Sequence, residues 1–166
     1  MAEFDPVAIF GALNDHDVRY LVIGGIAARL RGAPLVTEDV DVTAAEDPDN
    51  LVALCTALRA LDAKLRTASD PDGVSFPIEP EMLGSARSWT LTTRYGDLDI
   101  IFEPAGSRGY ADLVRDADKL RVQVDPEVSA PVASLRDVIR TKEASGREKD
   151  RAALPMLRRT QEELGG

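Results

Sequence analysis

Hydrophobic positions along the chain recur with the period of a helix in some segments and with the period of a strand in others. Segments with a helical period are residues 5–14, 26–30, 46–61, 110–117, 134–146 and 148–163. Segments with the composition or alternation of a strand are residues 19–23, 37–42, 88–93, 98–102, 119–124 and 128–133. Because the two kinds of segment interleave over the whole length, the sequence predicts an α/β (α+β) protein.

Two connections refine this prediction. Residues 88–102 predict an antiparallel hairpin that turns at residues 94–97. Ser134 is a helix-capping residue, and the two helical segments that follow it predict a C-terminal helical hairpin. A chain of 166 residues is long enough for one domain with a proper core. We therefore expect a single domain over residues 1–166, with a sheet core in residues 1–133 and the helical hairpin in residues 134–166.

The apolar strand at residues 20–23 runs directly into Gly24 and Gly25. Glycine lets the backbone turn tightly and approach a ligand closely, and the amides that open the next helix favour an anion. This pattern suits a polyphosphate. Arg29 and Arg31, which follow on the short helix or just beyond it, are candidate phosphate ligands.

The next strand carries Asp39 and Asp41, whose side chains project from one face roughly 6–7 Å apart. Two neighbouring carboxylates repel each other unless a cation neutralises them, and carboxylate oxygens suit Mg²⁺. Asp99 lies in the middle of an apolar strand, where an unpaired charge is costly. A metal ion shared by all three aspartates compensates these charges. Asp97 is a rival to Asp99, but the pattern assigns it to the preceding turn.

Composition adds few constraints. No apolar run approaches the ~20 residues of a membrane span, and the N-terminus lacks the features of a signal peptide, so we expect a cytoplasmic protein without a membrane partner. The only cysteine, Cys55, lies in an apolar helical pattern and is assigned to the core. The net charge of −9 argues against nucleic acid, but residues 136–159 carry eight basic and four acidic side chains.

Near the C-terminus, residues 142–150 read Lys-Glu-Ala-Ser-Gly-Arg-Glu-Lys-Asp. Lys142 and Arg147 are candidate ligands of a triphosphate, and Asp150 on the next helix can orient Lys142 or a substrate hydroxyl. A charged surface held by salt bridges is the alternative interpretation of this segment. Residues 68–85, rich in Asp, Pro, Gly and Ser, predict a mobile loop over the site.

Taken in order, the strand, the Gly-Gly pair, the Asp-Val-Asp strand and the C-terminal motif resemble the nucleotidyltransferase superfamily that includes DNA polymerase β. The C-terminal motif is similar to that of the AbiEii/MenT-type toxins of toxin–antitoxin systems. The resemblance implies the nucleotidyltransferase fold, with a mixed, mainly antiparallel sheet flanked by helices. It also implies catalytic roles for Asp39, Asp41, Asp99, Lys142 and Asp150, with Asp99 as general base.

The resemblance further implies that one or two Mg²⁺ ions and an NTP are required, and that an NMP is transferred to the 3′ end of tRNA. Residues 136–159 are the expected contact of the tRNA acceptor stem, a cognate antitoxin is an expected partner, and we expect a monomer. Two alternatives stay open: transfer to a protein hydroxyl or to a small molecule such as an aminoglycoside, and a catalytically inactive nucleotide-binding module. Thr37, two residues before Asp39, is a candidate site of inhibitory phosphorylation.

Overall fold

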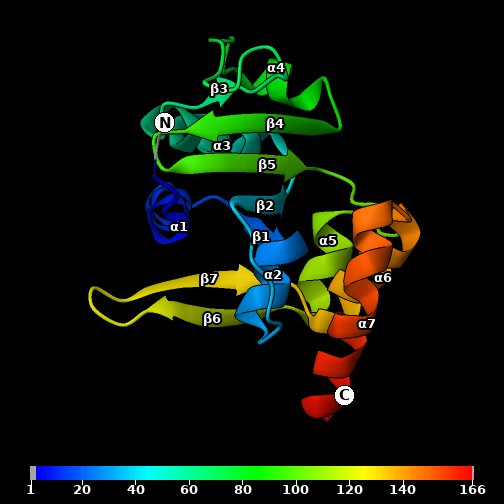
Figure 1. Cartoon of the computed structure of the whole chain (residues 1–166). Coiled ribbons are helices and arrows are strands. Elements are labelled where there is room, and N and C mark those ends of the chain that lie inside the picture. The colour runs from blue at the N-terminus through cyan, green and yellow to red at the C-terminus, as the bar shows by residue number, and fades with distance from the viewer. Residues whose placement is uncertain (1–2, 166) are drawn as a thin grey trace.

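The computed structural model describes residues 3–165, so residues 1, 2 and 166 of the expected domain lie outside the described part. In chain order, the elements are α1 (Pro6–Asp15), β1 (Tyr20–Ile23), α2 (Gly24–Leu30), β2 (Asp39–Ala44), α3 (Pro48–Ala60), β3 (Lys64–Leu65), α4 (Pro80–Gly84), β4 (Ser88–Thr93), β5 (Gly96–Ile101), α5 (Tyr110–Leu113), the 3-10 helix η1 (Val114–Asp116), β6 (Asp118–Gln123), β7 (Val128–Val132), α6 (Leu135–Ser145) and α7 (Glu148–Glu163) (Figure 1).

Within residues 3–165, the strands form one seven-stranded sheet in the order β3-β4-β5-β2-β1-β7-β6. The pairs β3–β4, β4–β5, β2–β1 and β7–β6 are antiparallel, whereas β5–β2 and β1–β7 are parallel. The prediction of a mixed, mainly antiparallel sheet is therefore confirmed. The parallel contact of β2 with β5 joins two segments that are distant in the sequence, and it is this contact that builds the site described below.

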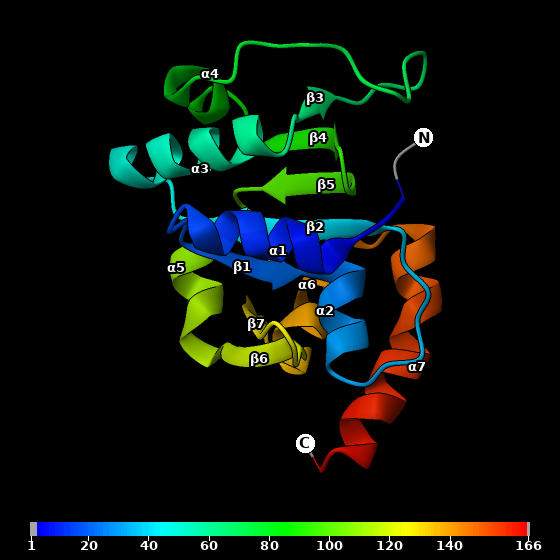
Figure 2. The ribbon, with the colours of Figure 1, turned by 90° about the vertical axis from the view of Figure 1, so that its left-hand side faces the viewer.

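Alternation along β2 and β5 gives this part of the sheet one apolar and one polar face. Val40 and Val42 of β2, with Leu98 and Ile100 of β5, are fully buried. They belong to the same hydrophobic core as the buried residues of α1 and α3. In Figure 2 these two helices lie side by side in front of the sheet. The aspartates alternate with these residues and therefore lie on the opposite face.

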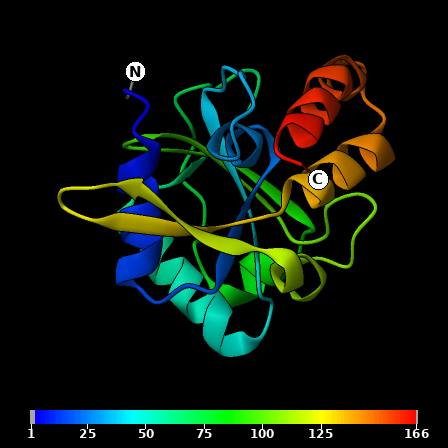
Figure 3. The same cartoon turned by 90° about the horizontal axis from the view of Figure 1, so that it is seen from below.

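The predicted helix starts are found where the capping residues place them. Asp5 accepts a hydrogen bond from the backbone N–H of Ala8, and Ser134 accepts one from the N–H of Asp137. The C-terminal hairpin forms as expected, with α6 and α7 packed against each other. Figure 3 shows this hairpin on the side of the molecule opposite to the projecting β6–β7 hairpin. No helix within the described range is long and apolar enough to cross a membrane.

Three differences between the structure and the predicted elements bear on the site. The predicted strand at residues 37–42 begins only at Asp39, so Thr37 belongs to the preceding segment. Asp97 lies within β5 and not in the turn, because the turn between β4 and β5 is tighter than expected. The segment 68–85 contains the helix α4, and the stacked rings of Phe76 and Trp89 hold it against β4. This segment therefore lies at the outer edge of the sheet.

Candidate active site

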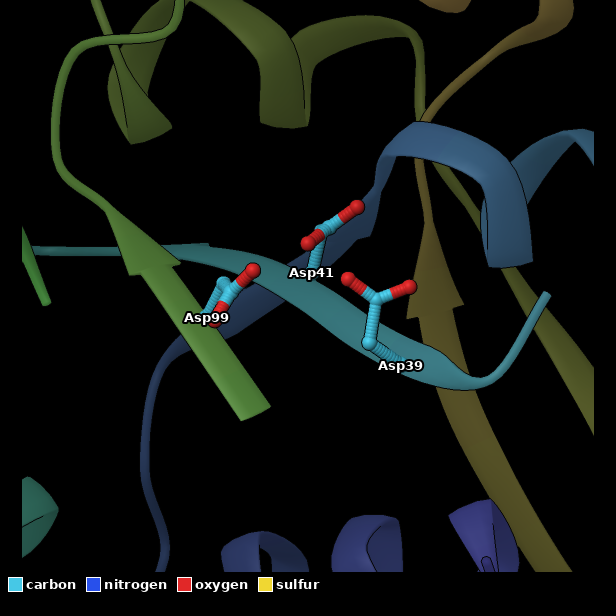
Figure 4. Close-up of side chains that lie close together, drawn as sticks. All are labelled: Asp39, Asp41 and Asp99. Atoms are coloured by element: carbon cyan, nitrogen blue, oxygen red, sulfur yellow. The ribbon is translucent and has the colours of Figure 1, made fainter. Parts of the chain in front are cut away.

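Three carboxylates meet on the polar face of the sheet, where β2 lies beside β5. The parallel register places Asp41 opposite Asp99 and Asp39 opposite Asp97. One oxygen each of Asp39, Asp41 and Asp99 lies within 4.8 Å of the others, and Figure 4 shows the three side chains converging. The structure thus brings together the three aspartates that the sequence selected as metal ligands.

Gly24 allows the backbone of α2 to begin directly against this cluster. Its φ is +67°, a conformation that residues with a Cβ rarely adopt, and a Cβ at this position would lie 2.3 Å from Oδ2 of Asp41. Gly25 is less constrained, since a Cβ there would meet Thr37 Oγ1 at an ordinary contact distance of 3.5 Å. The first glycine of the pair is therefore required by the site itself.

Burial and the neighbouring carboxylates shift the pKa of Asp41. Burial, followed by the negative charges of Asp39 and Asp99, raises the pKa of Asp41 to about 7. The ammonium groups of Lys142 and Lys149 lower the pKa of Asp41, but they do not offset these effects. The cluster holds more negative charge than its surroundings compensate, which is the condition that a bound cation relieves.

Asp99 has a direct cationic partner that the sequence pattern did not indicate. Arg66, just after β3, places Nη2 at 3.1 Å from Oδ1 of Asp99 and Nη1 at 3.0 Å from Oδ2 of Asp97. Burial raises the pKa of Asp99, Arg66 lowers it and Asp39 raises it, with a net upward shift. Because Arg66 lies 33 positions before Asp99, only the pairing of β3, β4 and β5 could reveal the contact.

A pocket of about 770 Å³ lies between the start of β2, the start of α2 and the C-terminal hairpin. Its lining includes acidic residues of β2 on one side and basic residues of the hairpin on the other. Among the lining residues are Gly24, Gly25, Thr37, Glu38, Asp39, Asp41, Thr141, Lys142, Ser145, Arg147, Lys149 and Asp150. The two charged segments that are far apart in the sequence therefore face each other across one cavity.

The hairpin side of this pocket is organised around Asp150, whose side chain is only 1% exposed. Arg147 Nε and Ser145 Oγ donate hydrogen bonds to its Oδ2 at 2.8 and 2.7 Å, and Lys142 Nζ lies 3.5 Å from its Oδ1. Burial alone would raise the pKa of Asp150, but these hydrogen bonds and the charge of Lys142 lower it to about 2. Asp150 is thus a fixed anion that holds basic side chains at the pocket.

The remaining candidates are placed as follows. Arg29 is exposed and does not line the pocket. Arg31 does not face the pocket either, because its guanidinium donates to the backbone carbonyls of Val132 and Ala133 and pairs with Asp118. Thr37 does line the pocket, and its hydroxyl donates to Asp39 Oδ1 over 3.1 Å. The lining contains no residue of the segment 68–85, so the predicted loop does not cover this pocket.

No family model matches the chain, and no curated protein matches it in sequence. A candidate nucleotidyltransferase from Thermotoga maritima is similar in structure, with a TM-score of 0.56 at 15% identity, over 93% of this chain and 94% of that chain. The lincosamide antibiotic adenylyltransferase LnuA, solved with lincomycin bound, is similar with a TM-score of 0.58 at 16% identity, over 95% of this chain and 98% of that chain. The chain has the nucleotidyltransferase fold.

At such identities the nucleotidyltransferase fold is shared, while the chemistry has to be argued from the side chains of this chain. On this fold, the half-buried aspartate cluster occupies the polar face of β2 and β5, and the basic hairpin stands across the pocket from it. The cluster offers three hard oxygen donors on two rigid strands. That donor set fits Mg²⁺.

Proposed function

We propose that the protein is a Mg²⁺-dependent nucleotidyltransferase that transfers an NMP from an NTP to an acceptor hydroxyl. The observation that carries this proposal is the convergence of Asp39, Asp41 and Asp99 on a nucleotidyltransferase fold, at the edge of a pocket with a basic opposite wall. Bound Mg²⁺ would neutralise charge on the triphosphate and on the developing pyrophosphate. Asp39, Asp41 and Asp99 would hold one or two such ions.

The other pocket residues serve the nucleotide. Lys142 is 15% exposed and faces the pocket as a compact charge for a phosphate oxygen, with Arg147 beside it. Gly24 keeps the backbone close to Asp41, so that a phosphate can approach both the α2 amides and the cluster. Asp150 supports this wall of the pocket, because it holds Lys142 and Arg147 in place.

Asp99 acts as the general base. Its carboxylate takes the proton of the acceptor hydroxyl, and the hydroxyl oxygen forms a bond to the α-phosphorus. The bond between the α-phosphorus and the oxygen bridging to the β-phosphate then breaks, and pyrophosphate leaves with that electron pair. The hydrogen bond from Arg66 keeps the Asp99 carboxylate oriented while it accepts the proton.

For the acceptor, we propose the 3′ end of tRNA, with the protein acting as the toxin of a toxin–antitoxin pair in the cytoplasm. The similarity of residues 142–150 to the AbiEii/MenT-type motif supports this assignment, as does the positive balance of residues 136–159, which suits an acceptor stem. In this proposal the protein works as a monomeric single domain, and a cognate antitoxin restrains it. Phosphorylation of Thr37 is one such restraint, since its hydroxyl contacts Asp39.

A small-molecule hydroxyl is the second candidate acceptor. The structural similarity to LnuA, a lincosamide antibiotic adenylyltransferase, specifically favours it. A protein hydroxyl is a third candidate acceptor, and an inactive nucleotide-binding module is the one candidate without catalysis. The intact aspartate cluster weighs against the inactive module.

The deciding experiment incubates the protein with each α-labelled NTP and Mg²⁺, in separate reactions with total tRNA, lincomycin, an aminoglycoside and a protein extract. We expect label in tRNA with wild-type protein and none with Asp41→Asn or without Mg²⁺. Label in lincomycin or the aminoglycoside would select the second candidate. Absence of label in every reaction, together with Mg²⁺-independent nucleotide binding, would refute nucleotidyl transfer.

A further inference from the structure

A second pocket of about 510 Å³ lies on the same polar face of the sheet, on the far side of β5 from the first pocket. The two pockets share Glu38, which directly precedes β2. The sheet register explains why the second pocket is polar, since Asp97, Thr92 and Lys64 stand opposite one another on β5, β4 and β3. The polar surface that begins at the aspartate cluster thus continues across these strands.

The charged groups around this second pocket are largely uncommitted. The side chains of Glu38, Asp62, Lys64, Asp72 and Arg94 line it, and none of them forms an ion pair within the described structure. Acidic and basic groups are mixed, so the pocket lacks the uniform positive charge that a run of phosphates requires. Carboxylates and ammonium groups interleaved with the Thr92 hydroxyl suit a ligand rich in hydroxyl groups.

Arg66 connects this pocket to the proposed general base. It lines the second pocket, and its guanidinium reaches across β4 to Asp97 and Asp99 while Nη1 donates to the carbonyl of Leu91 over 2.8 Å. The Arg66 side chain is only 22% exposed, and its contacts with Asp97, Asp99 and the carbonyl of Leu91 fix it in position. Arg66 engages Oδ1 of Asp99, which leaves Oδ2 for other contacts.

Asp99 lines neither pocket, but Asp39 and Asp41 beside it line the first, and its partner Arg66 lines the second. Asp99 therefore lies between the two pockets, in a place where a hydroxyl held beside Arg66 can give it a proton while the triphosphate occupies the first pocket. We propose that the second pocket binds the sugar-like, hydroxyl-bearing end of the acceptor, with Arg66 as the positioning residue that aims Asp99 at it. This proposal rests on the nucleotidyltransferase function proposed above.

In the reaction, an O–H of the bound sugar gives its proton to Asp99, its oxygen bonds to the α-phosphorus of the NTP, and pyrophosphate leaves. A pocket of about 510 Å³ holds a single sugar or nucleoside unit. The terminal ribose of tRNA and the sugar of a lincosamide share this chemistry. Separate reactions with total tRNA and with lincomycin distinguish the two sources.

The test measures kcat and KM for the NTP and for whichever of these two probes becomes labelled. Arg94 and Asp72 are exposed, so Arg94→Ala and Asp72→Ala should leave the fold intact. Each should raise the acceptor KM about tenfold, as expected for loss of one hydrogen bond to a charged group, and leave the NTP KM unchanged. Arg66→Ala should instead lower kcat, with partial recovery in Arg66→Lys. Lys119→Ala, which removes an exposed charge on β6, is the matched control and should behave as wild type.

An acceptor KM within twofold of the Lys119→Ala value for both pocket variants would overturn the proposal. So would an Arg66→Ala enzyme whose kcat equals that of wild type. If the wild-type protein labels only a protein acceptor, the sugar pocket is refuted while nucleotidyl transfer stands. If it labels nothing, the proposed function fails first, and the acceptor pocket fails with it.

Discussion

Replacing Asp41 with asparagine should stabilise the metal-free protein at neutral pH while it abolishes nucleotidyl transfer. The folded protein raises the pKa of Asp41 to about 7 from an ordinary value of 3.8. Between these two values the folded state holds a proton that the unfolded state has released, so wild-type stability falls as pH rises through this window. Because the asparagine side chain cannot ionise, the stability of the variant should not fall with pH for this reason.

The size of the effect follows from the shift. A difference of about 3 pKa units corresponds to about 4 kcal/mol, which is a ceiling because side chains relax around the charge. For a domain of this length, each kcal/mol moves Tm by roughly 2–4 °C, so the gain reaches roughly 8–16 °C at pH 8. Within the described residues, no hydrogen bond contributes to the pKa shift of Asp41, so replacing its carboxylate with an amide removes no such hydrogen bond.

The assay is thermal unfolding of wild type and Asp41→Asn in EDTA from pH 4 to pH 8, repeated with excess Mg²⁺. The Tm difference should be near zero at pH 4 and grow towards pH 8. Mg²⁺ should raise the Tm of wild type more than that of the variant, because a ligand stabilises the state that binds it. Glu127→Gln, at an exposed glutamate of the β6–β7 turn, is the control and should show no such pH-dependent gain. A variant that is less stable than wild type at pH 8 would refute the electrostatic argument.

Three further outcomes are expected. Gly24→Ala should lower both the activity and the Tm, measured by an activity assay and by thermal melting, whereas Gly25→Ala should fold normally. Equal behaviour of the two variants would contradict the close contact at Gly24. Lys142→Ala and Asp150→Ala should each reduce kcat/KM steeply and the double variant little more, and small additive losses in this double-mutant cycle would leave both residues only the role of a structural salt bridge. Thr37→Glu should abolish transfer, and a fully active variant, with no added phosphate mass after co-expression with the antitoxin, would remove the phosphorylation hypothesis.

The sequence by itself determined most of the local structure. Asp5 and Ser134 marked helix starts because their side chains satisfy free backbone N–H groups, an interaction confined to a few neighbouring residues. The alternation along residues 39–42 assigned Val40 and Val42 to the core and Asp39 and Asp41 to the other face. Because Asp39 and Asp41 belong to one strand, their common face was predictable from the period of two alone.

The tertiary structure decided which segments meet. The parallel register of β2 and β5 brings Asp99 to Asp41, and the pairing of β3 with β4 brings Arg66 to Asp99. It also decided which arginines serve the site, since Arg31 is held by backbone carbonyls of β7 and Arg147 lines the pocket. A side chain's charge is visible in the sequence, but its partner depends on strand order and on packing between distant segments. Those contacts involve no local period, and therefore no pattern along the chain could specify them.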